Sequence, residues 1–327
     1  MTLNQLQTYI VGVLQGYFPN KAVLDKLSES ADGTLLFDGQ QISGEALVTD
    51  AELQQAITDT LAELGITDEE IEANVGSFAA LKTVIANGAT LITVTEPLAI
   101  SEDAVLEAEE PIKIIANGIV DAFTVTGGTL TLGKNISITT DTAGLWANGG
   151  NIVVDGAKIT GSNAEMCIAT VSDNSEMLVK SGSIVSTGNS VAVALGTNAK
   201  MTVEGGLVET TAEISEAGRG WCAAYAGNGG IVEVTGGTLQ STNGHGLVAV
   251  TNGTVKVSGG TIDSVLSHEA KTAKAEISGG TIGMVMVEDG ASAIVTGGIF
   301  DTDPSTYVPD GYTVLNANDT YSVIKNV

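Results

Sequence analysis

Apolar residues follow two different periods along the chain. Over the first 76 residues they recur at helical spacing, whereas from about residue 90 to 300 they alternate with polar residues in short runs separated by glycine-containing turns. The first period predicts amphipathic helices, and the second predicts β-strands. The apolar positions of the first helix are Leu3, Leu6, Ile10, Val13, Leu14 and Tyr17.

A short phrase recurs eight times in the alternating region. It consists of Val or Ile, any residue, two small residues that are mostly Gly-Gly, any residue and an apolar residue. Repetition at this kind of period indicates stacked repeats, so we expect a right-handed parallel β-helix with three short strands per coil and glycines at its sharp bends. A β-sandwich also has frequent turns, but it does not require one phrase to recur in phase. The copies are Val125–Leu130, Val154–Ile159, Val179–Ile184, Val203–Val208, Val234–Leu239, Val257–Ile262, Ile277–Ile282 and Val295–Phe300.

The pattern divides the chain into three parts. Residues 1–76 are expected to form a small helical module with one tight β-hairpin element at Leu35–Phe37. Residues 77–300 are expected to form the parallel β-helix, beginning with a short helix and a first strand. Residues 301–327, where the phrase stops and three of the six tyrosines lie, are expected to form a C-terminal cap.

Composition restricts the partners of such a rod. The net charge is −26, with 13 basic residues against 39 acidic ones. Nucleic-acid binding depends on Lys and Arg that neutralise phosphates, so the balance argues against a nucleic-acid partner. The sequence contains no apolar window of 18 residues, so no membrane-spanning helix is expected. The segment Met1–Tyr17 has no basic region and no uninterrupted apolar run, so it does not resemble a signal peptide, and we expect synthesis in the cytoplasm.

The acidic residues offer only weak candidates for catalysis. Parallel β-helices include polysaccharide lyases and glycoside hydrolases, and hydrolysis needs two carboxylates held about 5–10 Å apart. Asp141 with Asp155, or Glu213 with Glu216, could form such pairs. Acidic residues are so frequent in this chain that pairs arise by chance. We therefore expect no catalytic residue.

The scarce histidines and cysteines do not form a recognisable site in the sequence. His245 and His268 have no partners at ligand spacing, so no metal site and no cofactor are expected. Cys167 and Cys222 lie in apolar, strand-like surroundings about two repeats apart. We interpret them as small buried hydrophobic residues that form no disulfide.

Two segments depart from the coil pattern and are candidates for contacts. The insertion Thr211–Gly227 carries Arg219, Trp221 and Tyr225, residue types that dominate binding hot spots. It is either a glycan or protein contact or a loop whose aromatic residues cover the rod, whereas Trp146 is expected to pack locally. The helix over residues 1–17 either packs on a second helix at 50–64 or serves in oligomerisation and capsid docking, because 76 residues with few aromatics give a thin core.

Two stretches resemble known families. The phrases, with the ending Gly297–Phe300 and the segment Tyr307–Tyr312, resemble the glycine-rich, pectate-lyase-like β-helices of gut-bacterial and phage surface proteins over about residues 78–325. The segment Leu3–Ile42 resembles the N-terminal attachment region of bacteriophage virion fibres, head fibres in particular. That second resemblance implies a homotrimer that docks on the major capsid protein or another virion protein. Nothing in the chain matches a lyase active-site pattern.

The leading hypothesis is a structural virion protein, a head fibre or capsid decoration protein that projects a β-helical rod and contacts host-surface glycans. This hypothesis is motivated by a surface-type rod that lacks an export signal, because virion proteins leave the cell by lysis. The expected location is the capsid surface. The alternatives are a bacterial cell-surface adhesin and a polysaccharide lyase or hydrolase.

Overall fold

The chain separates into two compact units, Met1–Glu69 and Glu70–Val327, in the computed structural model. In the first unit only the backbone of three short antiparallel strands is described; the strand expected at residues 35–37 is β2, which pairs with β1 and β3. The helices expected there, and Leu3 to Tyr17 with them, lie outside the described residues. The strands are β1 (Leu27–Glu29), β2 (Leu35–Phe37) and β3 (Gln40–Gln41). In the second unit the structure describes residues 72–163, 165–213, 221–268, 272–288 and 290–326.

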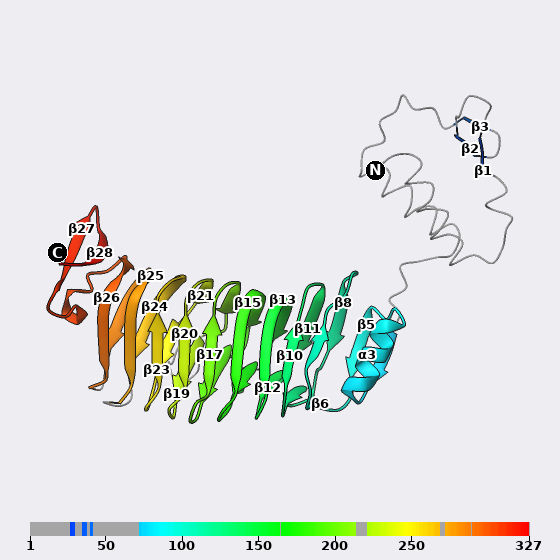
Figure 1. The fold of residues 1–327 in the computed structure, drawn as a ribbon, viewed down its shortest axis with the longest axis horizontal. Coiled ribbons are helices and arrows are strands. Elements are labelled where there is room, and N and C mark those ends of the chain that lie inside the picture. The colour runs from blue at the N-terminus through cyan, green and yellow to red at the C-terminus, as the bar shows by residue number, and fades with distance from the viewer. Residues whose placement is uncertain are drawn as a thin grey trace. The chain divides into compact units, whose positions relative to one another are not determined.

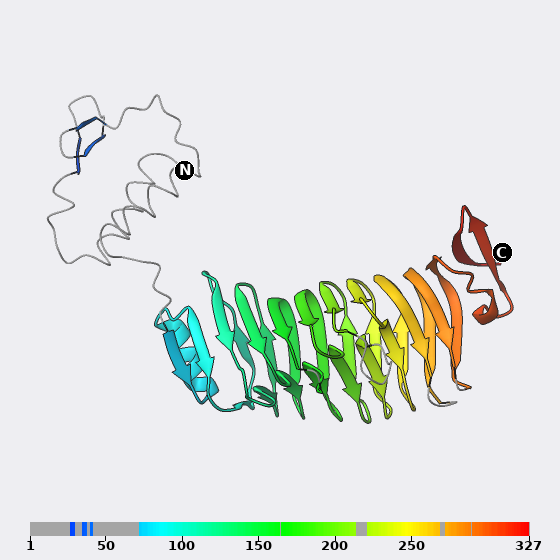
Figure 2. The same ribbon diagram turned by 180° about the vertical axis from the view of Figure 1, so that it is seen from behind.

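The second unit contains a parallel β-solenoid of about nine turns (Figures 1 and 2). Each turn contributes strands to three stacks, here called sheets 1, 2 and 3, in which each strand pairs with its equivalent in the next turn. Sheet 1 contains β7 (Ala104–Leu106), β10 (Thr129–Leu132), β17 (Lys200–Val203), β20 (Ile231–Val234), β23 (Thr254–Val257) and the first parts of β13 (Asn151–Gly161), β15 (Glu176–Ser186), β25 (Lys274–Val287) and β26 (Ser292–Phe300).

The other two sheets complete each turn. Sheet 2 contains β4 (Glu72–Val75), β5 (Leu91–Val94), β8 (Ile112–Ile115), β11 (Ile136–Thr140), β18 (Leu207–Thr210), β21 (Thr238–Ser241), the start of β24 (Thr261–Ser267) and the later parts of β13, β15, β25 and β26. Sheet 3 contains β6 (Leu98–Ile100), β9 (Phe123–Val125), β12 (Leu145–Ala147), β14 (Ala169–Val171), β16 (Ala192–Leu195), β19 (Cys222–Gly227), β22 (His245–Ala249) and the ends of β24 and β25. The prediction of a mainly β, parallel solenoid with three strands per turn is therefore confirmed.

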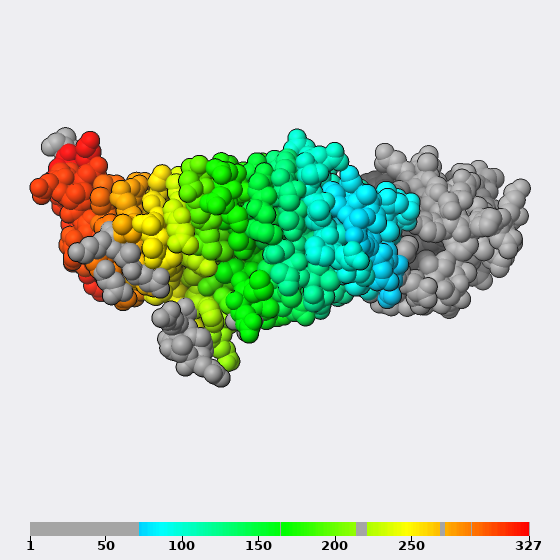
Figure 3. Space-filling model, turned by 90° about the horizontal axis from the view of Figure 1, so that it is seen from below, coloured from blue at the N-terminus to red at the C-terminus, as the bar shows by residue number. Residues whose placement is uncertain are grey.

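The core is a set of columns of equivalent apolar residues. Side chains alternate along a strand, so every second residue points inward and stacks on its equivalent one strand spacing, about 4.8 Å, away. Figure 3 shows the turns as successive colour bands along one continuous body. One column of sheet 1, buried throughout, consists of Leu130, Ile152, Met177, Met201, Val232, Val255 and Ala275.

The glycine phrase marks one corner of the solenoid, with one exception. Seven of its eight copies join sheet 1 to sheet 2. The first copy, Val125–Leu130, instead joins sheet 3 to sheet 1. Its Val125 lies in β9 of sheet 3, whereas Val154, the first residue of the second copy, pairs with Leu132 in sheet 1. The expectation that all eight copies are in phase was wrong at this position. A small-residue pair permits a bend wherever one is needed, so the phrase alone does not identify the corner.

The two glycines of a phrase are needed for different reasons. Gly260 has φ +82, a backbone conformation that L side chains rarely adopt. Gly259 lacks this constraint, but a Cβ added there would lie only 2.2 Å from the Thr235 carbonyl oxygen of the preceding turn. The corner therefore requires a missing side chain at one glycine and a left-handed backbone at the next.

The solenoid is preceded by a helix and followed by a hairpin (Figure 1). Helix α3 (Phe78–Ala86), which confirms the short helix expected there, begins at Ser77, whose hydroxyl accepts a hydrogen bond from the Ala80 amide at 3.2 Å. Its Phe78 and Leu81 are buried in the core. Strand β4 precedes this helix and pairs with β5, so the solenoid begins one strand before the expected start at residue 77. No helix in the described part of the chain is long and apolar enough to cross a membrane.

The last residues leave the parallel pattern. The 3-10 helix η2 (Ser305–Tyr307) is followed by β27 (Tyr312–Ala317) and β28 (Thr320–Lys325), which form an antiparallel hairpin. Strand β28 also pairs antiparallel with β26, and Val323 is buried there.

We predict that Gly259→Ala and Gly260→Ala each lower the free energy of unfolding by about 1–3 kcal/mol, the first through overpacking and the second through backbone strain. Gly76→Ala is the matched control. A Cβ at Gly76 would meet nothing closer than Thr95 Oγ1 at 3.4 Å, so stability should be unchanged or rise by up to about 1 kcal/mol. Urea denaturation followed by circular dichroism measures all three, and equal midpoints for the three variants would contradict the prediction.

A second prediction concerns two buried serines. Ser267 Oγ is buried without a hydrogen-bond partner among the described residues, whereas Ser186 Oγ accepts hydrogen bonds from the amides of Gly188 and Asn189 at 3.4 and 3.1 Å. Ser267→Ala should leave the free energy of unfolding unchanged or raise it, while Ser186→Ala should lower it by about 1–2 kcal/mol, because it leaves buried donors unpaired. The same denaturation experiment compares the two, and a larger loss for Ser267→Ala would disprove this assignment.

Candidate functional site

Sheet 3 is buried on both faces over several turns, unlike the other two sheets. In β16, β22 and β24 the inward residues are buried as expected, but the outward Val193, Val248 and Leu266 are also only 3%, 6% and 7% exposed. The equivalent outward positions of sheet 1 carry polar or charged side chains such as Glu233 and Lys256. Val248 and Leu266 pack with Cys222 in a small apolar cluster outside the main core, so the outer face of sheet 3 is covered by side chains in these turns and does not face water.

A groove of about 1090 Å³ lies over this face of sheet 3. It crosses the turns from β9 to β25, with one wall formed by segments that lead from sheet 2 into sheet 3. Its lining residues are Asp121, Ala143, Trp146, Glu165, Met166, Cys167, Thr170, Ser172, Asn189, Ser190, Val193, Leu195, Trp221, Cys222, Tyr225, His245, Val248, Val250, Leu266, His268 and Glu288.

Three of the four rarest residue types of the chain are concentrated in this groove. The chain has two Trp, two His and two Cys, and all six line it. They come from five different turns and are spread over about 120 positions of sequence, from Trp146 to His268. Random placement over a 327-residue chain would not bring them together, so the groove is the candidate functional site.

The structure brings together two of the three contact residues predicted in the insertion. Trp221 and Tyr225 both line the groove and are both half-buried. Tyr225, however, lies in β19, a regular strand of sheet 3, so the expected departure from the coil pattern was wrong for Cys222–Gly227. Arg219 belongs to the stretch 214–220, which lies outside the described residues. Trp146, expected to pack locally, donates a hydrogen bond from Nε1 to Ser172 Oγ of the next turn at 2.8 Å, and it also lines the groove. The role of these residues in contacts stays a prediction.

The thiols in the groove wall are suited to packing and not to nucleophilic chemistry. Burial raises the pKa of Cys222 to about 12, although a hydrogen bond with Ser190, whose Oγ lies 3.2 Å from Sγ, opposes the shift. Burial raises the pKa of Cys167 to about 11, opposed by a hydrogen bond with Tyr225. Both thiols are therefore protonated at neutral pH. Both cysteines are free; Cys222 is buried as expected, whereas Cys167 is only partly buried.

His245 is held by neighbours at the far end of the groove. Its Nδ1 lies 2.9 Å from Ser264 Oγ, and burial lowers the pKa of its imidazole, with the Asp263 carboxylate opposing the shift. The ring is thus kept neutral near pH 7, able to donate or accept one hydrogen bond through its second nitrogen. No group of three or more metal-ligating side chains occurs among the described residues.

Asp141 and Asp155, one of the two acid pairs considered for catalysis, are not brought together. Asp155 lies at the corner between sheets 1 and 2, where its carboxylate accepts a hydrogen bond from Ser181 Oγ at 2.9 Å. Asp141 follows β11 at the opposite end of sheet 2. Six strand residues separate these corners, or about 20 Å at 3.3 Å per residue, which exceeds the separation hydrolysis needs. Glu213 is described but Glu216 is not, so that pair stays untested.

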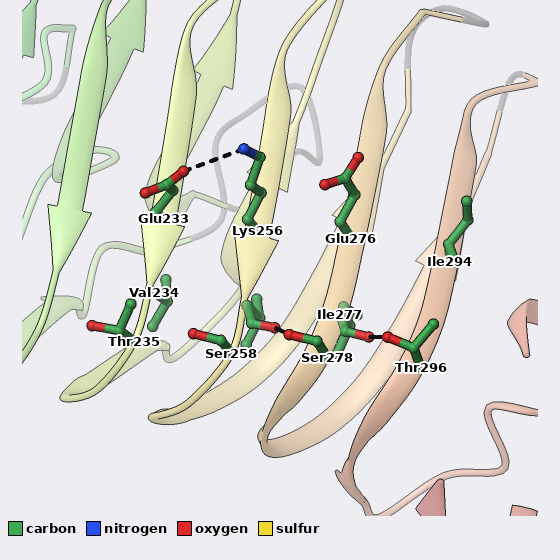
Figure 4. Close-up of a pocket in the computed structure, with 11 residues that line it drawn as sticks. Glu233, Val234, Thr235, Lys256, Ser258, Glu276, Ile277, Ser278, Ile294 and Thr296 are labelled. Atoms are coloured by element: carbon green, nitrogen blue, oxygen red, sulfur yellow. Dashed lines mark hydrogen bonds and ion pairs between the residues drawn. The ribbon is translucent and has the colours of Figure 1, made fainter. Parts of the chain in front are cut away.

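A second, smaller hollow of about 450 Å³ lies on sheet 1 (Figure 4). Its charges are paired within the chain, since Glu233 contacts Lys200 Nζ at 2.8 Å and Lys256 Nζ at 3.3 Å. Its hydroxyl groups are also engaged: Ser278 and Thr296 each donate to a backbone carbonyl of the preceding turn at 3.3 Å. We interpret these ion pairs, Lys200 with Glu233 and Glu233 with Lys256, as an ion-pair ladder that holds neighbouring turns together beside the hollow.

The groove could have been found only in part from the sequence. Most strands alternate apolar and polar residues, but 191–195 and 246–250 read as continuous apolar runs, which is the pattern of strands buried on both faces. That signal locates sheet 3. It does not show that Trp146, Cys167 and His245 share one hollow, because their proximity depends on the register of several turns of unequal length.

We predict that the ion-pair ladder makes stability depend on pH. The hydrogen bond from Lys200 is the main cause that lowers the pKa of Glu233 in the folded chain. A depressed carboxyl pKa contributes stability that is present above the unfolded value, about 4.3, and is lost as the pH falls through the folded value.

Glu233→Gln should therefore destabilise the protein at pH 7 by up to about 1 kcal/mol, and the difference from wild type should vanish between about pH 4.5 and pH 3. Thermal melts across this range test it, with the exposed Glu204→Gln as the control. A difference that persists undiminished at pH 3 would refute an electrostatic origin.

Comparison with known proteins identifies no relative of this chain. A scan against models of protein families found no match, and neither the curated proteins nor the solved structures searched contained a similar chain. The solenoid and its groove are therefore interpreted from their own residues.

Proposed function

We propose that the protein is a structural virion protein, a phage head fibre or capsid decoration protein, whose β-solenoid displays the sheet 3 groove for contact with host-surface glycans. The observation that carries the binding role is the concentration of both Trp, both His and both Cys in one groove. Aromatic side chains present large, rigid surfaces that gain binding energy at low entropic cost, and they are the commonest hot-spot residues.

The chemistry of the groove favours binding over catalysis. Its thiols are protonated at neutral pH, and burial keeps His245 neutral beside Ser264. A rigid solenoid suits a display role, because each turn is fixed by hydrogen bonds to both neighbours and the groove retains its shape without a ligand.

Attachment is proposed for the N-terminal segment. The resemblance of Leu3–Ile42 to fibre attachment regions supports docking on the major capsid protein through the apolar positions Leu3 to Tyr17, with assembly as a homotrimer on the capsid surface. We further propose that the winding is right-handed, as parallel crossovers almost always are. The hairpin of residues 301–327 would then act as a cap, since β28 occupies the edge of β26 that another turn would otherwise pair with.

The proposal is tested on particles of the phage that encodes the chain. Antibody labelling of purified virions should decorate the capsid, and sedimentation should give three times the chain mass. The double variant Leu6→Asp/Ile10→Asp should abolish particle labelling, whereas Gln5→Asp/Gln7→Asp, on the polar face predicted from the sequence, should not. A stable monomer absent from particles would overturn the proposal, and labelling of the bacterial surface in its place would point to an adhesin.

A further inference from the structure

The described side chains that line the groove include carboxylates but no Lys or Arg. The three carboxylates belong to Asp121, Glu165 and Glu288. The chain as a whole carries a net charge of −26. A ligand with many negative charges would enter this groove against like charge at both ends, whereas an uncharged or positively charged ligand would not.

The floor of the groove is a continuous row along the solenoid axis. The strand register places Trp146, Thr170, Val193 and Tyr225 on successive turns in equivalent outward positions. Three steps of about 4.8 Å separate the indole from the phenol ring, or about 14 Å. The row then continues through Val248 and Leu266. Two aromatic surfaces at this separation suit a long, linear ligand that crosses the turns and not a compact one.

Polar groups accompany the aromatic row. His245 and His268 lie at its edge with imidazole groups, whereas the buried Asn189 and Ser190 are hydrogen-bonded within the chain, Ser190 to Cys222. Alternating apolar faces and hydrogen-bonding edges match the faces and hydroxyl rims of sugar rings, which stack on aromatic side chains through their C–H surfaces. An apolar helix would not use these polar edges, and a peptide strand would need an open sheet edge, which the middle of sheet 3 does not offer.

We propose that the groove binds a linear glycan of uncharged or amine-bearing sugars along the solenoid axis and discriminates against uronate- or phosphate-bearing glycans. This inference rests on the proposed function in one respect, that the displayed ligand is a glycan. It adds the class of glycan and the residues that select it: Trp146, Trp221 and Tyr225 supply stacking, and Asp121, Glu165 and Glu288 supply the charge selection.

Intrinsic fluorescence gives a direct assay, because both tryptophans of the chain lie in the groove. Three hexasaccharides serve as probes on the full chain: N-acetylglucosamine oligomer, its deacetylated amine form, and oligogalacturonate. The first two should change tryptophan emission at saturation, and the uronate should bind at least about tenfold more weakly at low salt. Trp146→Phe and Trp221→Phe should each remove part of the signal.

The charge selection is tested with matched triple variants. Asp121→Asn/Glu165→Gln/Glu288→Gln removes three charges from the groove, and Glu102→Gln/Glu176→Gln/Glu204→Gln removes three exposed charges elsewhere. The groove variant should lose most of the preference for the amine form over the uronate, and the control should keep it. Equal loss in both variants would show that only the net charge matters and would overturn the assignment of these carboxylates.

The remaining outcomes separate this inference from the proposed function. Uronate binding as tight as that of the other two probes would overturn the glycan class while leaving a glycan-displaying fibre. No emission change with any probe at millimolar concentration would overturn the groove as a glycan site, and particle labelling would then decide the fibre role on its own.

Discussion

The spacing of about 4.8 Å between hydrogen-bonded strands is the constraint on which the rest of this structure depends. Every turn must follow the path of the one before it at this distance, at its corners as well as in its strands. The corner at Gly259 illustrates the consequence, since there is no room for a Cβ beside the Thr235 carbonyl. The same spacing stacks equivalent side chains directly on one another, so one substitution affects three turns.

The stacking rule also explains how a solenoid with few aromatic residues forms a stable core. Columns of Val, Ile, Leu, Met and Ala fill a narrow interior, as in the column from Leu130 to Ala275. On the outside, charges are arranged in ladders such as Lys200, Glu233 and Lys256, which offset part of the repulsion expected from 39 acidic residues. Sheet 3 departs from this plan, because its outer face is apolar and hollowed over several turns.

The departure at sheet 3 connects fold to function. A parallel solenoid converts positions far apart in sequence into neighbours on a ladder, so Trp146 and Tyr225, separated by 79 residues, lie in one outward row three turns apart. Coils of unequal length still keep this register, because the extra residues are placed at the corners. The longest interval has its extra residues between β18 and β19. It supplies Trp221, the residue before β19, to the groove, while β19 keeps its register with β16 and β22.

The sequence by itself determined the architecture, because the glycine phrase and the alternation of apolar residues are local signals of bends and strands. It also indicated the helix at Phe78–Ala86 and the strand at Leu35–Phe37. It did not determine which corner the phrase at Val125–Leu130 occupies, since a bend of small residues fits more than one corner. Only the tertiary structure decided the site. The register of successive turns fixes which outward side chains meet, and no local pattern around Trp146, Cys167 or His245 contains that information.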